Sequence, residues 1–366
     1  MPVGCQRQAV LLSPGLRLYH VGMTPQDKAD LVSRLALEAG FDAVGFAEAG
    51  PVARQAYFRE WLRQGRHGEM DYLARTAEIR VDPGRLLPGA RSLVVVAQSY
   101  KPAAETRESV GTVAAERRGG PTDGPRGRIA RYAWGRDYHR VLRRKLRRLA
   151  DRLRRAITEP FEARVCVDTA PVLEREFAAA AGVGWIGKNT LLMHPRLGSY
   201  LFLGEIVTTL ELAPSRPMGD RCGSCSQCLE ACPTGALVEP HRMDATRCIA
   251  YLTIEHRGEI PAELASAMGE WVFGCDLCQE VCPYNRKAPP AGEPEFGLSD
   301  RFVLPPRPLL EQIMNLTDQQ RRKWLSGSAM KRATLAMLKR NAAIAMENEG
   351  KSQNVIISGS SAESVG

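Results

Sequence analysis

Eight cysteines lie in one stretch of the sequence and have the spacing of iron–sulfur ligands. The first run reads C-x2-C-x2-C-x3-C-P and ends at Pro233; this is the pattern of bacterial [4Fe–4S] ferredoxins. A second run also ends in a proline, Pro283, but the position three before Cys275 is Val272. Cys248 is therefore expected to supply the missing ligand from upstream. The eight thiolates are Cys222, Cys225, Cys228, Cys232, Cys248, Cys275, Cys278 and Cys282.

Eight thiolates can hold two cubane clusters of four ligands each. In two-cluster ferredoxins the fourth cysteine of each run ligates the other cluster. This crossing predicts that one cluster is held by Cys222, Cys225, Cys228 and Cys282. The other cluster is then held by Cys232, Cys248, Cys275 and Cys278.

Zinc and disulfides are the alternatives for so many cysteines. Two structural zinc ions would also use eight thiolates, commonly as paired C-x2-C knuckles. Three cysteines at successive spacings of three residues, followed by C-P, fit a cubane better. Disulfides require an oxidising compartment, and the apolar residues near the N-terminus end too early, at Pro14, for a signal peptide. The two remaining cysteines, Cys5 and Cys166, are expected to be unligated.

The composition is that of a globular protein with an excess of positive charge. The chain has 366 residues, of which 44% are hydrophobic and 25% are charged, and a net charge of +9. This charge favours a polyanionic partner. No apolar run approaches the roughly 20 residues that span a bilayer, so we expect a cytoplasmic protein without a membrane partner.

Changes in composition along the chain suggest five segments. Residues 1–23 show no period, and the tail from 350 to 366 is polar enough to predict disorder. Between them we expect an α/β core, a cluster domain and a C-terminal segment, the last with one amphipathic helix over 329–347. The core carries a long surface loop over 102–127, rich in Gly, Pro, Glu and Arg. The expected bounds are 24–215 for the core, 216–290 for the cluster domain and 291–349 for the C-terminal segment.

Within the core, hydrophobic periodicity predicts alternating helices and strands. Thr24 and Pro25 read as the start of a helix that ends near Gly40. The run Leu93-Val94-Val95-Val96-Ala97 reads as a buried strand. Alternation of this kind favours an α/β core built on mostly one sheet. The other expected strands are 41–47, 161–168 and 199–212, and the other expected helices are 56–64 and 171–181.

The most basic part of the chain is a predicted helix that follows Asp137. Its apolar residues recur at helical spacing, so one stripe packs in the core while the opposite face is strongly cationic. Such a face is often only solvated, but the scarcity of acids here favours phosphate binding. The arginines of this face include Arg140, Arg143, Arg144, Arg147, Arg148 and Arg155.

Two familiar motifs are present only in part. Gly182-Val183-Gly184-Trp185-Ile186-Gly187 matches G-x-G-x-x-G, but the preceding residues read as a helix where a dinucleotide or phosphate loop needs a strand. A Walker A motif also needs Ser or Thr after Lys188, and the chain has Asn189. These glycines are expected to mark a loop in which the backbone approaches another segment closely.

Asp137-Tyr138-His139 resembles the start of D-x-H-x-x-G, the pattern with which some proteins supply a histidine to cobalamin. The sixth position is Leu142, and the motif lies on the basic helix. We therefore expect His139 to be an ordinary histidine on a helix surface.

Several motifs together resemble one enzyme family, the epoxyqueuosine reductases. The resemblance covers about residues 24–345 and includes the odd position of Cys248. It departs at the C-terminus, where some relatives carry several helical repeats and this chain has room for one. The matching motifs are residues 129–139 (IARYAWGRDYH), 167–169 (VDT), 184–189 (GWIGKN), 198–200 (GSY), 203–205 (LGE), 232–237 (CPTGAL) and 251–255 (YLTIE).

The resemblance implies a fold, a reaction and a set of cofactors. The fold is an α+β or α/β, nitroreductase-like cobalamin-binding core with a mixed sheet, joined to a ferredoxin-type domain with two [4Fe–4S] clusters and a short C-terminal helical segment. The reaction reduces epoxyqueuosine in a tRNA anticodon loop to queuosine. An external low-potential donor supplies the electrons to what is expected to be a monomer. The implied cobalamin contacts are Arg80, Ala130, Asp168, Lys188, Asn189, Leu192 and Leu203.

Asp168 is the general acid that the resemblance implies. An acid that donates a proton near neutral pH needs a raised pKa, which burial beside an apolar corrin would give. From the residues alone, Asp168 could equally cap a helix that begins near Pro171, and Thr169 could take the same position.

Two other functions share parts of this pattern. A corrinoid reductive dehalogenase has two clusters and a related core but usually an export signal, and it acts on small halogenated molecules. An electron-transfer module would use residues 1–215 only to dock a partner. The basic helix disfavours the dehalogenase, and bound cobalamin would exclude the electron-transfer module.

Overall fold

The computed structural model describes residues 22–103, 124–297 and 307–360, with side chains described as far as Lys351. Most of the predicted loop over 102–127, almost all of the segment 1–23, and Cys5 lie outside the described residues. In the described residues, no helix is long and apolar enough to cross a membrane.

Four strands form the central sheet, in the order β1-β2-β7-β4. All three pairings are antiparallel, so the central sheet is not the mixed sheet that the sequence suggested. A parallel pair occurs outside it, between β3 (Arg128–Ile129) and β8 (Trp271–Phe273). The strands of the central sheet are β1 (Ala43–Glu48), β2 (Ser92–Ser99), β7 (Leu201–Thr208) and β4 (Ala163–Cys166).

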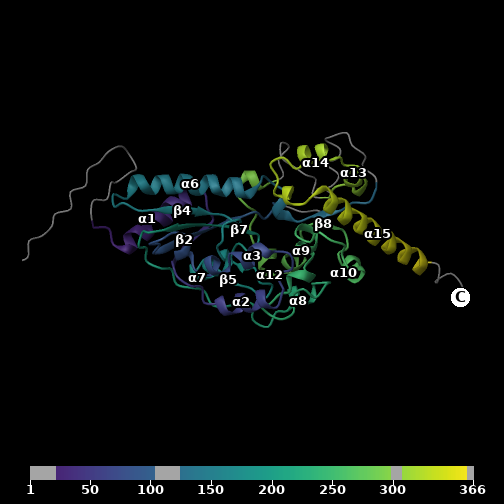
Figure 1. Cartoon of the computed structure of the whole chain (residues 1–366), viewed down its shortest axis with the longest axis horizontal. Helices are drawn as coiled ribbons and strands as arrows, with labels where there is room; N and C mark the ends of the chain where they lie inside the picture. Colours follow the sequence, from purple (N-terminus) through teal and green to yellow (C-terminus); the bar gives the residue numbers. More distant parts are fainter. Residues whose placement is uncertain (1–21, 104–123, 298–306, 361–366) are drawn as a thin grey trace, which may run out of the picture.

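Helices cover both faces of this sheet (Figure 1). Val94 and Val96 of β2 pack with helices α1 (Pro25–Glu38) and α6 (Tyr138–Ala156). The alternate residue Val95 packs on the other face, together with helix α7 (Glu174–Ala180). Because both faces are covered, every residue of β2 is buried, which explains the unbroken apolar run in the sequence.

Local signals placed the first helix and the basic helix well. The Thr24 hydroxyl accepts from the backbone N–H of Asp27, and the Asp27 carboxylate accepts from the backbone N–H of Thr24, so the predicted N-terminus is a full capping box. Gly40 follows the helix with φ +80°, a conformation that suits glycine. In α6 the predicted stripe of Val141, Leu142 and the residues that follow is buried.

The elements beside Asp168 are shorter than predicted. Strand β4 ends at Cys166 and helix α7 begins at Glu174, whereas the sequence suggested bounds near 168 and 171. Pro171 is therefore not in the first turn of the helix, and Asp168 is six residues before Glu174. The alternative in which Asp168 caps this helix is wrong.

The glycine-rich segment forms a hairpin of β5 (Trp185–Ile186) and β6 (Leu192–Met193). A Cβ atom on Gly184 would lie 2.2 Å from the carbonyl oxygen of Met193. A helix, α7, precedes these glycines, which confirms that they are a close-packed loop and not a dinucleotide motif.

The cysteine-rich residues form a compact set of short elements beside the sheet (Figure 1). Strand β3 belongs to the core in sequence, yet Arg128 and Ile129 pair with β8, and this ties the two parts together. The remaining helices here are α8 (Gln227–Glu230), α9 (Ile249–Ile254), α10 (Ala262–Ala267), α11 (Leu277–Glu280) and α12 (Pro283–Lys287).

The C-terminal segment adds α13 (Leu310–Met314), α14 (Asp318–Trp324) and α15 (Leu335–Ser360). Helix α15 packs on α13 and β8. It begins six residues later than predicted and continues past Gly350 to Ser360; residues 361–366, the end of the tail that was expected to be disordered, lie outside the described residues. A single glycine inside a helix costs only about 1 kcal/mol, and no proline interrupts this stretch. The remaining helices near the site are α2 (Gln55–Arg63), α3 (Asp71–Arg75) and α4 (Ala77–Val81).

Candidate active site

Asp168 lies in the turn between β4 and α7 with its backbone in the left-handed region. Its φ is +53°, which is uncommon for a residue with a side chain and tends to mark functional sites. The Asp168 side chain is 47% exposed. The carboxyl group is thus held by a constrained turn and still faces outward.

His139 links this carboxyl group to the start of the basic helix. Its Nδ1 lies 2.7 Å from Oδ1 of Asp137, and its Nε2 lies 2.8 Å from Oδ2 of Asp168. Asp137 is also the N-cap of α6 and accepts from the His139 backbone N–H. The expectation that His139 is an ordinary surface histidine is wrong, because both ring nitrogens contact carboxylates.

Two carboxylate partners favour the charged imidazolium, in which both ring nitrogens donate. Burial acts to lower the pKa of His139, but the hydrogen bonds and charges of Asp137 and Asp168 outweigh it and raise the pKa to about 9. At neutral pH the proton of this group is therefore on His139.

The pKa of Asp168 is lowered, contrary to the expectation from sequence. Burial acts to raise it, but the hydrogen bond and charge of His139, the Tyr138 hydroxyl and Arg332 outweigh burial. The sequence argument considered only an apolar surrounding and missed the imidazolium. Asp168 and His139 are best described as one acid–base pair.

Two further side chains of the site come from distant parts of the chain. Arg332, in the 3-10 turn before α15, donates to Glu255 at 2.8 Å and lies 5.3 Å from the ring centroid of Tyr72. Its charge reaches Asp168. No spacing in the sequence connects Arg332 to this site, because a C-terminal turn supplies it.

Arg80 is buried on the same side of the site, at the end of α4. Its side chain donates through Nε to Thr76 Oγ1 at 2.8 Å, and no carboxylate in the described residues forms an ion pair with it. Burial lowers the pKa of Arg80, and the charges of Tyr72, Asp168 and Glu174 oppose this. The rest of the guanidinium is therefore suited to an oxygen-bearing ligand.

Two other residues expected to contact cobalamin, Lys188 and Asn189, form hydrogen bonds to the backbone of this chain. Lys188 donates to the carbonyl oxygens of Gly223 and Cys225 at 2.6 and 2.9 Å, so its ammonium group holds the cluster loop. The amide oxygen of Asn189 accepts from the backbone N–H of Leu191. Both side chains serve the β5–β6 turn and its packing on the cluster domain.

The three apolar residues of that set lie in two separate cores. Leu192 and Leu203 belong to the cluster of buried side chains beneath α7. Ala130 packs instead with Ile249 and Trp271 of the cysteine-rich part. Tyr132 packs against the core that contains Ala130. Burial raises the pKa of Tyr132, and the nearby negative charge of Asp168 raises it further.

The eight cysteines lie near one another in the cysteine-rich part of the chain. Cys228 lies in the electrostatic reach of Cys222, Cys225 and Cys282. Cys275 is likewise near Cys248 and Cys232, and Cys278 is near Cys275, Cys248 and also Cys228 of the first run. The short helices α8 and α11, which carry Cys228 and Cys278, pack against each other. The division of the eight cysteines between two clusters stays a prediction.

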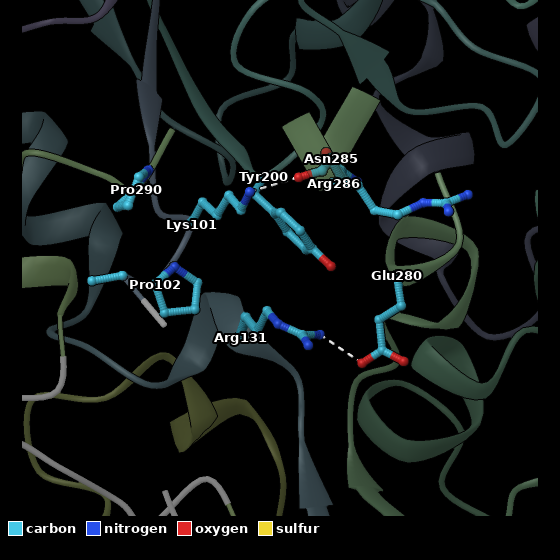
Figure 2. Close-up of a pocket in the computed structure, with 9 residues that line it drawn as sticks. Lys101, Pro102, Arg131, Tyr200, Glu280, Asn285, Arg286 and Pro290 are labelled. Atoms are coloured by element: carbon cyan, nitrogen blue, oxygen red, sulfur yellow. Dashed lines mark hydrogen bonds and ion pairs between the residues drawn. The ribbon is translucent and has the colours of Figure 1, made fainter. Parts of the chain in front are cut away.

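A pocket of about 310 Å³ separates the cysteine-rich part from the sheet. In Figure 2 the Lys101 ammonium points to Asn285 and the Arg131 guanidinium to Glu280, at 2.7 Å in each case. Arg131 also pairs with Asp276 at 3.0 Å. These bonds fix the cluster domain against the core.

Comparisons with known proteins agree with this geometry. A sequence profile described as "Epoxyqueuosine reductase QueG, DUF1730" matches residues 80–169, and one for a "4Fe-4S double cluster binding domain" matches residues 221–285. The epoxyqueuosine reductase of Pseudomonas aeruginosa is 40% identical over 339 residues, 89% of this chain and 90% of the relative. The Escherichia coli enzyme is 37% identical over 87% of this chain and 81% of the relative.

This chain belongs to the epoxyqueuosine reductase family. Its fold matches the solved epoxyqueuosine reductase of Streptococcus thermophilus with a TM-score of 0.75 at 31% identity, over 87% of this chain and 80% of that one. A structure of an epoxyqueuosine reductase with an epoxyqueuosine-modified tRNA-Tyr stem loop matches with a TM-score of 0.74 at 31% identity, over the same shares. The chain is thus an oxidoreductase with an iron–sulfur domain, and the resemblance seen in its motifs is confirmed.

The His139 pair gives a testable pKa. We predict that Asp137→Asn lowers the pKa of His139 from about 9 towards its ordinary value of about 6.5, because one of two partner charges is lost. The raised pKa stabilises the fold fully below about pH 6.5, and this contribution is lost as the pH rises through about 9. NMR titration of histidine-labelled protein measures the pKa, with a His139→Asn variant to assign the signal.

Asp151→Asn is the matched control, since Asp151 is on the same helix but 61% exposed. It should leave the His139 titration unchanged. A wild-type His139 pKa near 6.5 would contradict the ion-paired geometry.

Proposed function

We propose that this chain reduces the epoxide of epoxyqueuosine in tRNA to the alkene of queuosine, with cobalamin and two [4Fe–4S] clusters as cofactors. The observation that carries the proposal is the outward-facing Asp168, backed by a protonated His139, in a chain of this family. The overall reaction takes two electrons and two protons and releases water. The site must therefore deliver protons to an oxygen that leaves.

The clusters would carry the electrons one at a time from an external low-potential donor. We assign one cluster to Cys222, Cys225, Cys228 and Cys282, and the other to Cys232, Cys248, Cys275 and Cys278. The donor set supports this assignment because thiolates are the usual ligands of such clusters. Lys188 would support the first cluster by fixing the loop around Cys225.

Cobalamin fits the surroundings of Asp168. The buried Arg80 has N–H groups to offer to amide or phosphate oxygens, and Leu192, Leu203 and Ala130 would supply apolar contacts. Bound cobalamin would supply a reduced cobalt centre that acts on carbon. His139 has both ring nitrogens committed to Asp137 and Asp168, so it is unsuited to be a cobalt ligand.

Asp168 and His139 would act together on the leaving oxygen. The Asp168 carboxyl group faces the substrate, and the imidazolium behind it holds the proton at neutral pH. As negative charge develops on the epoxide oxygen, the proton on His139 Nε2 would pass to Asp168, and the carboxyl group of Asp168 would donate a proton to that oxygen. A low pKa of Asp168 in the resting site is compatible with this role because the pair, not the carboxyl alone, is the acid.

The Asp168→Asn variant tests this role. It keeps the shape of the side chain but has no acidic proton, and we predict a single-turnover rate at least roughly a hundredfold lower, since general acids typically contribute about 10²–10⁴-fold. The assay uses pre-reduced enzyme and epoxyqueuosine-containing tRNA, so that electron delivery does not limit the rate.

The same variant should still bind tRNA and hold its iron and cobalamin, which absorbance and iron content report. A near-wild-type rate would show that another group donates the proton, and it would remove Asp168 from the chemistry.

We propose that the basic face of α6 binds the anticodon stem. It begins at Arg140, next to His139, and runs along the sheet (Figure 1). Several of its charges are already neutralised, since Arg144 pairs with Glu295 and Arg152 with Glu38. Of the arginines on α6, those exposed and without a carboxylate partner among the described residues are Arg140, Arg147, Arg148 and Arg155.

Charge reversal at Arg140, Arg147 and Arg148 should weaken tRNA binding. Each lost phosphate contact reduces counterion release, so we predict that the slope of log affinity against log salt becomes shallower by about two to three. Filter binding or anisotropy over a salt series measures it. The matched control reverses Arg59, Arg63 and Arg242, which have carboxylate partners, and should change the slope little. An equal loss of tRNA affinity in both charge-reversal variants would mean that binding depends on the net charge of the protein and not on the basic face of α6.

A tRNA substrate is also consistent with a cytoplasmic monomer. We propose this state for the protein, with the external electron donor as its only protein partner. Size-exclusion chromatography with light scattering tests the monomer.

A further inference from the structure

Glu205 is a buried acid that the proposed chemistry does not use. It lies on β7, paired with Cys166 of β4 and Val95 of β2. It is 0% exposed, and neither carboxyl oxygen has a hydrogen-bond partner in the described part of the chain. An ionised carboxylate in such a position costs several kcal/mol, so the group requires a physical account.

The groups around Glu205 favour its protonated form. The Glu174 carboxyl of α7 is within hydrogen-bonding reach, and the charge of Asp168 is also felt. On β4 the neighbour is the Cys166 thiol, whose contact is the carbonyl oxygen of Arg164, and on β2 it is the apolar Val95. No cation forms an ion pair with Glu205 among the described residues. Burial, with these neighbouring carboxylates, raises the pKa of Glu205 well above its usual range.

Two neighbouring buried carboxyl groups without a cation cannot both be ionised, so at least one of them keeps a proton. Here the proton must be on Glu205 or Glu174, because each is otherwise only an acceptor towards the other. Burial, and then the charge of Asp168, raises the pKa of Glu174 to about 8. Since the pKa of Glu205 is raised as well, Glu205 keeps its proton at neutral pH.

Glu174 connects this pair to the active site. Its Oε1 accepts the backbone N–H of Asp168, the residue with the left-handed backbone. A hydrogen bond from Glu205 would fix the Glu174 carboxyl group, and Glu174 in turn fixes the Asp168 turn. The contacts run from the middle of the sheet through Glu174 and Asp168 to His139.

We propose that Glu205 is a positioning residue: as a neutral acid it donates to Glu174, and the pair holds Asp168 against His139 in the orientation that faces the substrate. This deepens the proposed function, since it concerns the orientation of the acid in that reaction. No covalent step is assigned to Glu205. Its contribution is orientation, and misplacing a reacting group by about 1 Å can cost as much as a hundredfold in rate.

Two substitutions separate the hydrogen bond from the charge. Glu205→Gln keeps the shape and an N–H donor, so the Asp168 turn and the single-turnover rate should stay within about threefold of the wild type. Glu205→Met fills the space without a donor, and the rate should fall at least roughly tenfold. Both the wild type and Glu205→Gln should lose activity as His139 loses its proton near pH 9.

A second readout does not depend on activity. In Glu205→Met the His139 pKa should fall from about 9, because Asp168 is no longer held against the ring. In Glu205→Gln it should stay. Infrared difference spectra should also show loss of a protonated carboxyl band in Glu205→Gln. If Glu205→Met fails to fold, the infrared band and the His139 titration of Glu205→Gln still decide the question.

The proposal is overturned if Glu205→Met keeps both the rate and the His139 titration of the wild type. It is also overturned if Glu205→Gln is impaired as much as Glu205→Met, since this would mean that an ionised Glu205 is required. Failure of the proposed function is distinguishable, because the wild type would then leave epoxyqueuosine unconverted while the His139 titration still responded to these substitutions.

Discussion

The contact of His139 with two carboxylates is the interaction on which the site depends. Asp137 both caps α6 and holds one ring nitrogen, so the start of the basic helix and the position of the imidazole are set by the same residue. The other nitrogen reaches Asp168, on the turn after β4. The hydrogen bonds from Asp137 through His139 to Asp168 thus join the start of the basic helix to the proposed proton donor and to the end of strand β4.

The central sheet supplies the rigidity that these hydrogen bonds require. Its two middle strands, β2 and β7, are covered on both faces, and Asp168 projects from the end of an adjacent strand. Arg332 and Arg80 approach the same site from the C-terminal segment and from α4. These two arginines place positive charge near a negatively charged substrate, and the sheet holds Asp168 in position. Charged groups that are held in place before the reaction stabilise the charge that develops in the transition state.

Local chemistry was readable from the sequence, and long-range contacts were not. The cysteine runs, the capped first helix and the buried strand around Val95 each follow from spacing or periodicity alone. The antiparallel order of the sheet did not follow, because the paired residues are 39 to 116 positions apart in the sequence. His139 was missed because its motif was tested only as a cobalt ligand. Glu205 lies in a recognised motif, yet only the fold reveals that it faces another acid, Glu174.

The central claim is that this chain removes the epoxide oxygen from a tRNA nucleoside. The most direct test is mass spectrometry of tRNA nucleosides from cells in which this chain is the sole epoxyqueuosine reductase and its gene has been deleted. The account predicts that epoxyqueuosine accumulates and that the wild-type gene restores queuosine. Unchanged queuosine in the deleted strain would contradict it.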